Sequence, residues 1–326
     1  MIATVFAFTA EALHIGLILV SAPLLIGVLR LVKARLQGRT GPSVVQPFRD
    51  LLRLLRKQPV LAYNASLLFR AVPVIGFAAT LAAACLVPSF TLGMALAPIS
   101  DLLVIVGLLT LARVTLALGA MDIGTAFGGL GASREMMFST FAEPAMILVI
   151  FTLALLAGST NLDLISDVLR GGTLGLRVSL GLALVACLAV AITENGRIPV
   201  DNPSTHLELT MVHEAMVLEY SGRDLALIDA TAALKLLLWL TLISAVFFPF
   251  GLANVASPQL WPIGLLAWAG KICALTLVLA AFETAIAKMR VFRVPEFLGV
   301  AILLGLLAAV FLFVSTGFAG YAGSSN

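Results

Sequence analysis

The main pattern along the chain is a series of long apolar runs separated by short polar connections. A helix needs about 20 mainly apolar residues to cross the hydrocarbon core of a bilayer, which is about 30 Å thick. The pattern therefore predicts an all-α, polytopic membrane protein built as a bundle of about eight transmembrane helices. The predicted spans are Leu13–Val32, Leu67–Leu92, Ile99–Met121, Met136–Gly158, Leu174–Thr193, Leu225–Phe250, Ile263–Thr284 and Glu296–Thr316.

Composition agrees with a lipid environment. The chain is 61% hydrophobic and 11% charged, whereas soluble domains are about 45–50% apolar and about 25% charged. No polar stretch is long enough for a separate soluble domain. We therefore expect a single transmembrane domain, 1–326, with a basic loop at about 33–66 and an acidic loop at about 194–224.

The basic residues of the connections lie almost entirely on one side of the predicted bundle. That side carries Arg30, Lys33, Arg35, Arg39, Arg49, Arg53, Arg56, Lys57, Arg70, Arg134, Arg197, Arg223, Lys288, Arg290 and Arg293. The opposite side carries only Arg170 and Arg177. Cytoplasmic loops of membrane proteins are enriched in Lys and Arg. The bias predicts the cytoplasmic (inner) membrane of a prokaryote, with basic loops in the cytoplasm and both termini in the periplasm.

The basic loop combines a defined turn with a short amphipathic helix. Gly41-Pro42 marks the turn, and apolar and basic positions alternate at helical spacing after Pro47. A surface helix on anionic lipid explains the charge alone, whereas a platform for a soluble partner also explains the turn. The candidate docking residues are Arg35, Arg39, Arg49, Asp50, Arg53, Arg134 and Arg197.

Glu143, followed by Pro144, lies within the predicted fourth span. A carboxylate at that depth costs several kcal/mol unless it is paired, hydrated or neutral. It is therefore either a functional group or half of a structural ion pair. Ser133 is the predicted cap of this helix, which places Glu135 at the membrane boundary.

The acidic loop holds several carboxylates together with His206 and His213. Thr205 with Glu208 matches a capping box, so a helix is expected to start there. The histidine spacing does not match the zinc motif H-E-x-x-H, and the three cysteines form no C-x-x-C pair, so we predict no metal or iron–sulfur site on this chain. We interpret the carboxylates as a proton path toward Glu143. Its predicted members are Glu143, Glu194, Asp201, Glu208, Glu214, Glu219, Glu283, His206 and His213.

Three motifs resemble a known family. Ala-Arg-Leu-Gln-Gly-Arg-Thr-Gly-Pro, at 34–42, is similar to the first cytoplasmic loop of the complex I membrane subunit 1 family. Gly-Ala-Ser-Arg-Glu-Met-Met, at 131–137, and the long stretch 194–222 more closely resemble the formate hydrogenlyase and hydrogenase-4 branch of that family. The loop at 195–203 departs from the complex I pattern, which puts quinone binding in doubt.

The resemblance implies a non-catalytic subunit of a group 4 membrane-bound [NiFe]-hydrogenase complex. Such a subunit anchors the soluble electron-transfer arm and couples it to ion movement. The implied partners are hydrogenase large and small subunits, an iron–sulfur subunit and antiporter-like membrane subunits, besides the lipid bilayer and without nucleic acid. The NiFe centre and iron–sulfur clusters are expected on those partners. By position, Glu143, Glu208, Glu214 and Glu219 would line the proton path, with Arg39 and Asp50 on the docking surface.

Three other readings stay open. The chain could be the quinone-chamber subunit of a complex I-like NADH:quinone oxidoreductase. It could belong to a hydrogenase-related complex that lacks NiFe chemistry. A standalone secondary transporter is the third reading, although transporters commonly show matched repeats and none is clear in this sequence.

Overall fold

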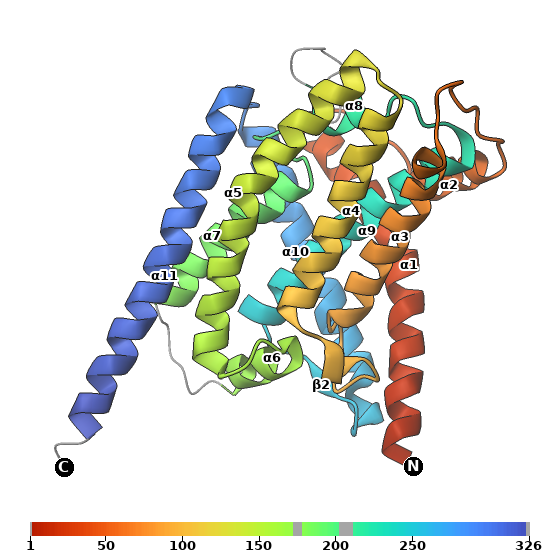
Figure 1. The fold of residues 1–326 in the computed structure, drawn as a ribbon. Coiled ribbons are helices and arrows are strands. Elements are labelled where there is room, and N and C mark those ends of the chain that lie inside the picture. Colours follow the sequence, from red (N-terminus) through yellow and green to blue (C-terminus); the bar gives the residue numbers. More distant parts are fainter. Residues whose placement is uncertain (1, 172–177, 202–210, 324–326) are drawn as a thin grey trace.

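The computed structural model describes residues 2–171, 178–201 and 211–323 as a helical bundle (Figure 1). Seven described helices are long and apolar enough to span a membrane. They are α1 (Ile2–Leu36), α3 (Leu67–Leu86), α4 (Leu102–Asp122), α5 (Ala126–Ala157), α9 (Gly222–Phe247), α10 (Trp261–Ala285) and α11 (Val294–Gly323). The remaining predicted span coincides with α7 (Val178–Glu194), of which 17 residues are described. The polytopic all-α prediction is confirmed.

Short elements close the two ends of the bundle. One end carries α2 (Gln46–Leu55), α8 (His213–Val217) and the 3₁₀ helix Val291–Arg293, while the other carries α6 (Leu162–Arg170) and the parallel strands β1 (Thr91–Leu92) and β2 (Ala253–Asn254). The 3₁₀ helices Ala97–Ile99 and Pro258–Leu260 adjoin these strands in sequence. The first turn of α1 lies at the β2 end, as does the last turn of α11 (Figure 1). The end with α2 and α8 is called the inner end below, following the predicted orientation.

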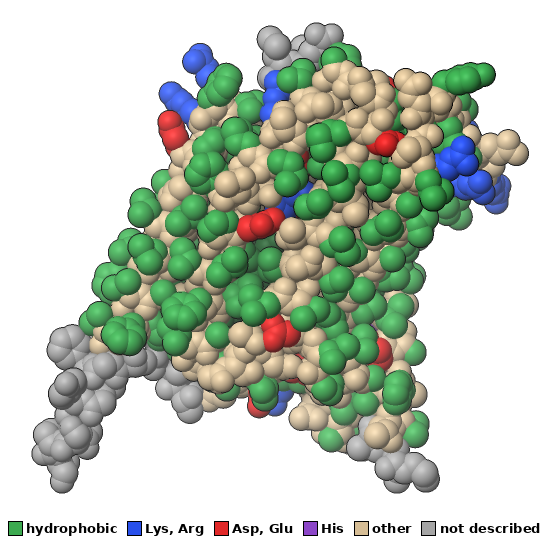
Figure 2. Space-filling view, viewed as in Figure 1, with side chains coloured by type: hydrophobic (Ala, Val, Ile, Leu, Met, Phe, Trp, Pro, Cys, Tyr) green, Lys and Arg blue, Asp and Glu red, His purple; other side chains and the backbone are tan. Residues whose placement is uncertain are grey.

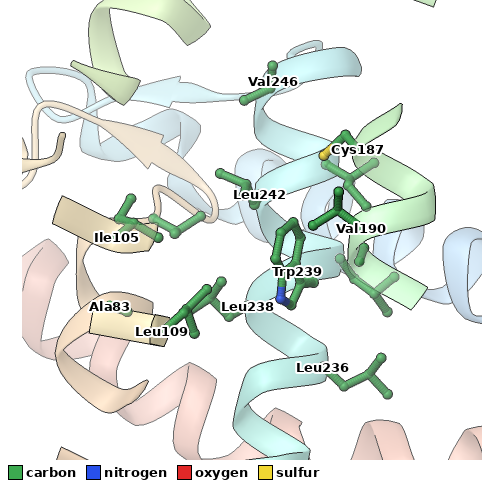
Figure 3. Close-up of a cluster of buried hydrophobic side chains, with 14 of the residues drawn as sticks. Ala83, Ile105, Leu109, Cys187, Val190, Leu236, Leu238, Trp239, Leu242 and Val246 are labelled. Atoms are coloured by element: carbon green, nitrogen blue, oxygen red, sulfur yellow. The ribbon is translucent and has the colours of Figure 1, made fainter. Parts of the chain in front are cut away.

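Helix α9 is the centre of the core. Its span is 72% buried, whereas the other candidate spans are 28–44% buried. Trp239 of α9 packs between Val190 of α7 and the α4 side chains near Leu109 (Figure 3). The outer helices instead present apolar side chains to their surroundings, as expected where lipid is the solvent (Figure 2).

Helix α5 begins well before its predicted start at Met136. Its N-cap is Thr125, whose hydroxyl accepts the amide of Gly128 at 3.3 Å, and the predicted cap, Ser133, lies inside the helix. Small residues made this first stretch look like a connection, but they allow close packing. A Cβ at Gly128 would lie 2.2 Å from a backbone oxygen of α4. The earlier start places Glu135 inside a spanning helix and not at its boundary.

Candidate functional site

Arg113 of α4 joins three carboxylates in the interior of the bundle. Its side chain is 6% exposed, and its guanidinium forms an ion pair with Glu194 at the end of α7. Nη1 lies 3.4 Å from Oε1 of Glu143, and Nε lies 3.9 Å from Oε1 of Glu135, both on α5. Lys235 of α9 approaches the same Glu194 carboxylate at 3.1 Å. We call these five residues the Arg113 cluster.

The cluster provides an anionic partner for two basic side chains that lie at membrane depth. Ionised side chains at membrane depth need partners, and Arg113 and Lys235 both fall within apolar runs. Glu194 serves both of them, because it ends α7 at the depth where α4 and α9 pass. Glu194 is among the predicted proton-path residues, whereas Glu135, which was predicted at the membrane boundary, is not.

Glu143 occupies the most accessible position in the cluster. Its side chain is 35% exposed, whereas that of Glu194 is 4% exposed. The hydroxyls of Thr110 and Ser139 both donate to its Oε1 at 3.3 Å. Acidic side chains also interrupt the otherwise apolar flank of the molecule (Figure 2). Glu143 is thus ion-paired through one oxygen without being enclosed.

A cavity of about 380 Å³ adjoins the cluster toward the inner end. Glu135, Glu194, Arg113 and Lys235 form part of its wall. A water needs about 10–15 Å³ of such volume and two to four polar partners, so the cavity can hold a chain of waters. The other titratable side chains along the wall are Arg30, Lys33, Asp50, Arg197, Asp201, His213, Glu214 and Asp229.

Two further predicted carboxylates fasten the inner loop to the bundle. Asp201 receives the Lys288 ammonium at 2.7 Å and the backbone amide of His213 at 3.4 Å. Glu283, with 1% of its side chain exposed, lies 2.7 Å from Nζ of Lys33 and 3.8 Å from Nη1 of Arg197. These contacts hold the loop after α7 against α10 and α1, so they support the cavity wall.

The structure gathers some of the remaining predicted path residues and leaves others apart. His213 and Glu214 lie on α8 and line the cavity. Burial lowers the pKa of His213, which keeps the imidazole neutral. Glu219 is exposed and is not part of the cavity wall. His206 and Glu208, with their predicted helix start, lie outside the described residues.

The predicted amphipathic helix of the basic loop is α2, which begins at Gln46 with Pro47 in its first turn. Arg49 and Arg53 are exposed on α2, and Arg35 and Arg39 are exposed where α1 ends. Asp50 is partly buried and accepts hydrogen bonds from Gln46 at 3.0 Å and Arg53 at 3.1 Å. The exposed basic side chains form a surface at the inner end, which we call the α2 surface.

The other two predicted docking residues make contacts within the chain. Arg134 donates to the carbonyl oxygen of Met211 at 2.7 Å. Arg197 faces Glu283, and burial lowers the pKa of its guanidinium while the carboxylate opposes that shift. Both residues therefore hold the inner loop in place.

Within the described residues, no group of three or more His, Cys, Asp or Glu side chains is arranged to hold a metal ion. The site consists instead of acids, bases and hydroxyls next to a cavity. Such groups bind and pass protons, and the apolar bundle around them restricts where those protons can go.

The chain is similar to known proteins in both sequence and fold. A family model described as NADH dehydrogenase matches residues 10–315. Formate hydrogenlyase subunit 4 of Escherichia coli is 33% identical over 275 residues, or 84% of this chain and 89% of that protein. Hydrogenase-4 component C of Escherichia coli is 33% identical over 295 residues, or 90% and 92%. A chain of the membrane-bound sulfane sulfur reductase, an archaeal respiratory membrane complex, shares the fold with a TM-score of 0.77 and 20% identity, covering 94% of this chain and 99% of that one.

Proposed function

Because this chain belongs to the NADH dehydrogenase subunit 1 family and is a membrane subunit of a respiratory-type oxidoreductase complex, we propose a specific role for it. It is the membrane-anchor and proton-path subunit of a group 4 membrane-bound [NiFe]-hydrogenase complex of the formate hydrogenlyase or hydrogenase-4 type. It docks the soluble electron-transfer arm and couples that arm to ion translocation. The cofactors reside on partner subunits.

The observation that carries the proposal is the position of the Arg113 cluster. Glu135 and Glu194 border a cavity toward the inner end, while Glu143 reaches the flank of the bundle. Protons taken up in the cavity reach Glu143 through this cluster, and Glu143 delivers them to an adjoining antiporter-like membrane subunit. An isolated structural ion pair needs neither the cavity nor the 35% exposure of the Glu143 side chain.

Replacing Glu143 with Gln tests the proton path. The variant keeps the shape of the side chain and its hydrogen bonds but cannot carry the proton. We expect the purified complex in liposomes to transfer electrons while moving no protons. Glu296→Gln, at an exposed acid on α11, is the matched control and should stay coupled. Normal coupling in Glu143→Gln would refute the proposal.

The α2 surface is the proposed dock for the soluble arm. Arg49→Glu combined with Arg53→Glu reverses two exposed charges without touching the core. We expect the soluble subunits to wash off the membrane at a salt concentration that leaves them bound to the wild type. Arg170→Glu, at the opposite end of the bundle, should retain them. Firm retention in the double variant would assign the surface to anionic lipid instead.

A quinone chamber is the second candidate, and the wall of the cavity favours it. Apolar residues of α1 and α3 form one side of that wall, including Ile26, Leu29 and Val72. Quinone-dependent turnover of the purified assembly would establish this function, and turnover that is independent of quinone would exclude it. A partner large subunit without two C-x-x-C pairs would identify instead a related complex that lacks NiFe chemistry.

A further inference from the structure

We propose that Glu135, Ser139 and Glu143 form a proton wire along α5, that Glu135 holds the wire's proton at rest, and that Arg113 switches between its two ends. This inference rests on the proposed function and deepens it. It adds three residues that the predicted path does not contain: Glu135, Ser139 and Arg113.

The spacing of the three side chains places them in a row. Residues four apart follow one another on the same face of an α-helix, at a rise of about 6 Å. Ser139 is therefore one turn from Glu135 and one turn from Glu143, and its hydroxyl already contacts Glu143 Oε1 at 3.3 Å. Glu135 borders the cavity, and Glu143 is partly exposed at the flank. The row thus connects the two places between which a proton must travel.

The charges of the cluster balance only if one of its carboxylates carries a proton. Arg113 and Lys235 supply two positive charges, and Glu135, Glu143 and Glu194 supply three negative ones if all are ionised. An uncompensated charge at membrane depth is costly. Two nearby groups do not supply the missing positive charge: Asp201 is paired with Lys288, and Glu214 lies next to His213, which is neutral.

Glu135 is the carboxylate that keeps this proton. Glu194 faces both cations, and Glu143 accepts two hydroxyls in addition to Arg113. Among the described residues, Nε of Arg113 lies 3.9 Å from Glu135, beyond hydrogen-bond distance, and the charge of Lys235 acts on this carboxylate from farther away. Within the described part of the chain, that buried Nε has no hydrogen-bond partner either. A carboxyl group that is only 15% exposed, and that accepts no hydrogen bond from the described residues, favours its neutral form.

The transfer balances in protons and charge. Glu135 gives its proton, through a cavity water, to the Ser139 oxygen, and the Ser139 hydroxyl gives its own proton to Glu143. Glu135 is then ionised and Glu143 is neutral. Arg113, whose unpartnered Nε already points toward Glu135, moves closer to the new charge and leaves Glu143. The cavity then reloads Glu135 once Glu143 has passed its proton on.

Infrared spectroscopy of the purified complex tests the resting proton. Wild type should show the C=O stretch of a protonated carboxylic acid, which shifts in D₂O. Glu135→Gln should remove that band, and Glu135→Asp should move it. A band that is unchanged in both variants, or that is absent from wild type, would overturn the assignment.

Proton movement per electron in liposomes tests the wire. Glu135→Gln should abolish it, and Ser139→Ala should lower it about a hundredfold, at the low end for loss of a proton-transfer group. Thr140→Ala is the matched control, because that neighbouring hydroxyl donates back to the Met136 carbonyl at 2.9 Å. If Glu143→Gln uncouples the complex but Glu135→Gln does not, the wire is wrong and the proposed function survives. If Glu143→Gln stays coupled, the proposed function itself fails.

Discussion

Removing the charge of Arg113 should destabilise the fold in a way that depends on pH. Arg113→Gln leaves the carboxylates of Glu135, Glu143 and Glu194 with only Lys235 as a cation. Breaking a buried ion pair by removing one partner costs about 3–5 kcal/mol. The bundle can limit this cost by binding a further proton on one of the three carboxylates.

The cost of that proton can be worked out. An ordinary glutamate has a pKa of about 4.3, so protonating it at pH 7 costs about 3.7 kcal/mol, at about 1.36 kcal/mol per pH unit. The cost of breaking the ion pair and the cost of binding the proton therefore agree: the free energy of unfolding should fall by about 4 kcal/mol at pH 7. The folded variant then binds one more proton than folded wild type, so lowering the pH reduces its loss of stability relative to wild type. The loss should shrink by roughly 2.7 kcal/mol between pH 7 and pH 5.

Unfolding in detergent micelles measures this loss. Titration with a denaturing detergent can be followed by tryptophan fluorescence, since Trp239 lies beside Glu143 and Glu194. Arg56→Gln, at an exposed arginine, is the control and should change the free energy of unfolding by less than about 0.5 kcal/mol. The reasoning is refuted if Arg113→Gln matches that control, or if its loss grows as the pH falls.

Three further predictions concern packing and titration. Gly264→Ala should destabilise the protein by roughly 1–3 kcal/mol in the same titration, because its Cβ would lie 2.4 Å from the Phe90 carbonyl oxygen. Gly270→Ala, on the same helix, is the control and should not destabilise the protein, because its Cβ would meet nothing within 4 Å. Lys271→Met should cost roughly 2–3 kcal/mol by the same measurement, since the ammonium donates to two carbonyls after α9 at 3.1 and 3.2 Å. Burial lowers the pKa of His213, so the unfolded chain gains a proton below about pH 6.5 that the folded chain does not. From pH 6.5 to 5, wild type should therefore lose stability relative to His213→Asn, which the difference between their two unfolding series across that range measures.

Much of the fold could be predicted because the bilayer imposes a length on each apolar run. The start of α5 could not, since Gly128 and its small neighbours resemble a connection until close packing against α4 is known. The position of Glu135 was predicted wrongly for this reason. It was expected at the membrane surface, but because α5 starts earlier it lies inside the helix.

Several charged residues of the site could be predicted from the sequence, but the ion pairs that they form could not. Glu143 and Arg113 each stand out as charges within apolar runs. The spacing of residues in one sequence does not show which helices pack against one another. The ion pair between Arg113 and Glu194 could therefore not be predicted. The useful signal is that Arg113 and Lys235 fall within apolar runs and need anionic partners, which Glu194 at the end of α7 provides.

Proton uptake by the Arg113 cluster requires that water from the inner face reach it through the cavity. Thr231, on the cavity wall of α9, is a suitable probe, because Thr231→Cys preserves its size. Cys273→Ser removes the exposed native thiol while the other cysteines are buried. We expect a charged, membrane-impermeant thiol reagent to modify the probe in inside-out vesicles and not in right-side-out ones. Modification only from the outer side, or from neither side, would contradict the account.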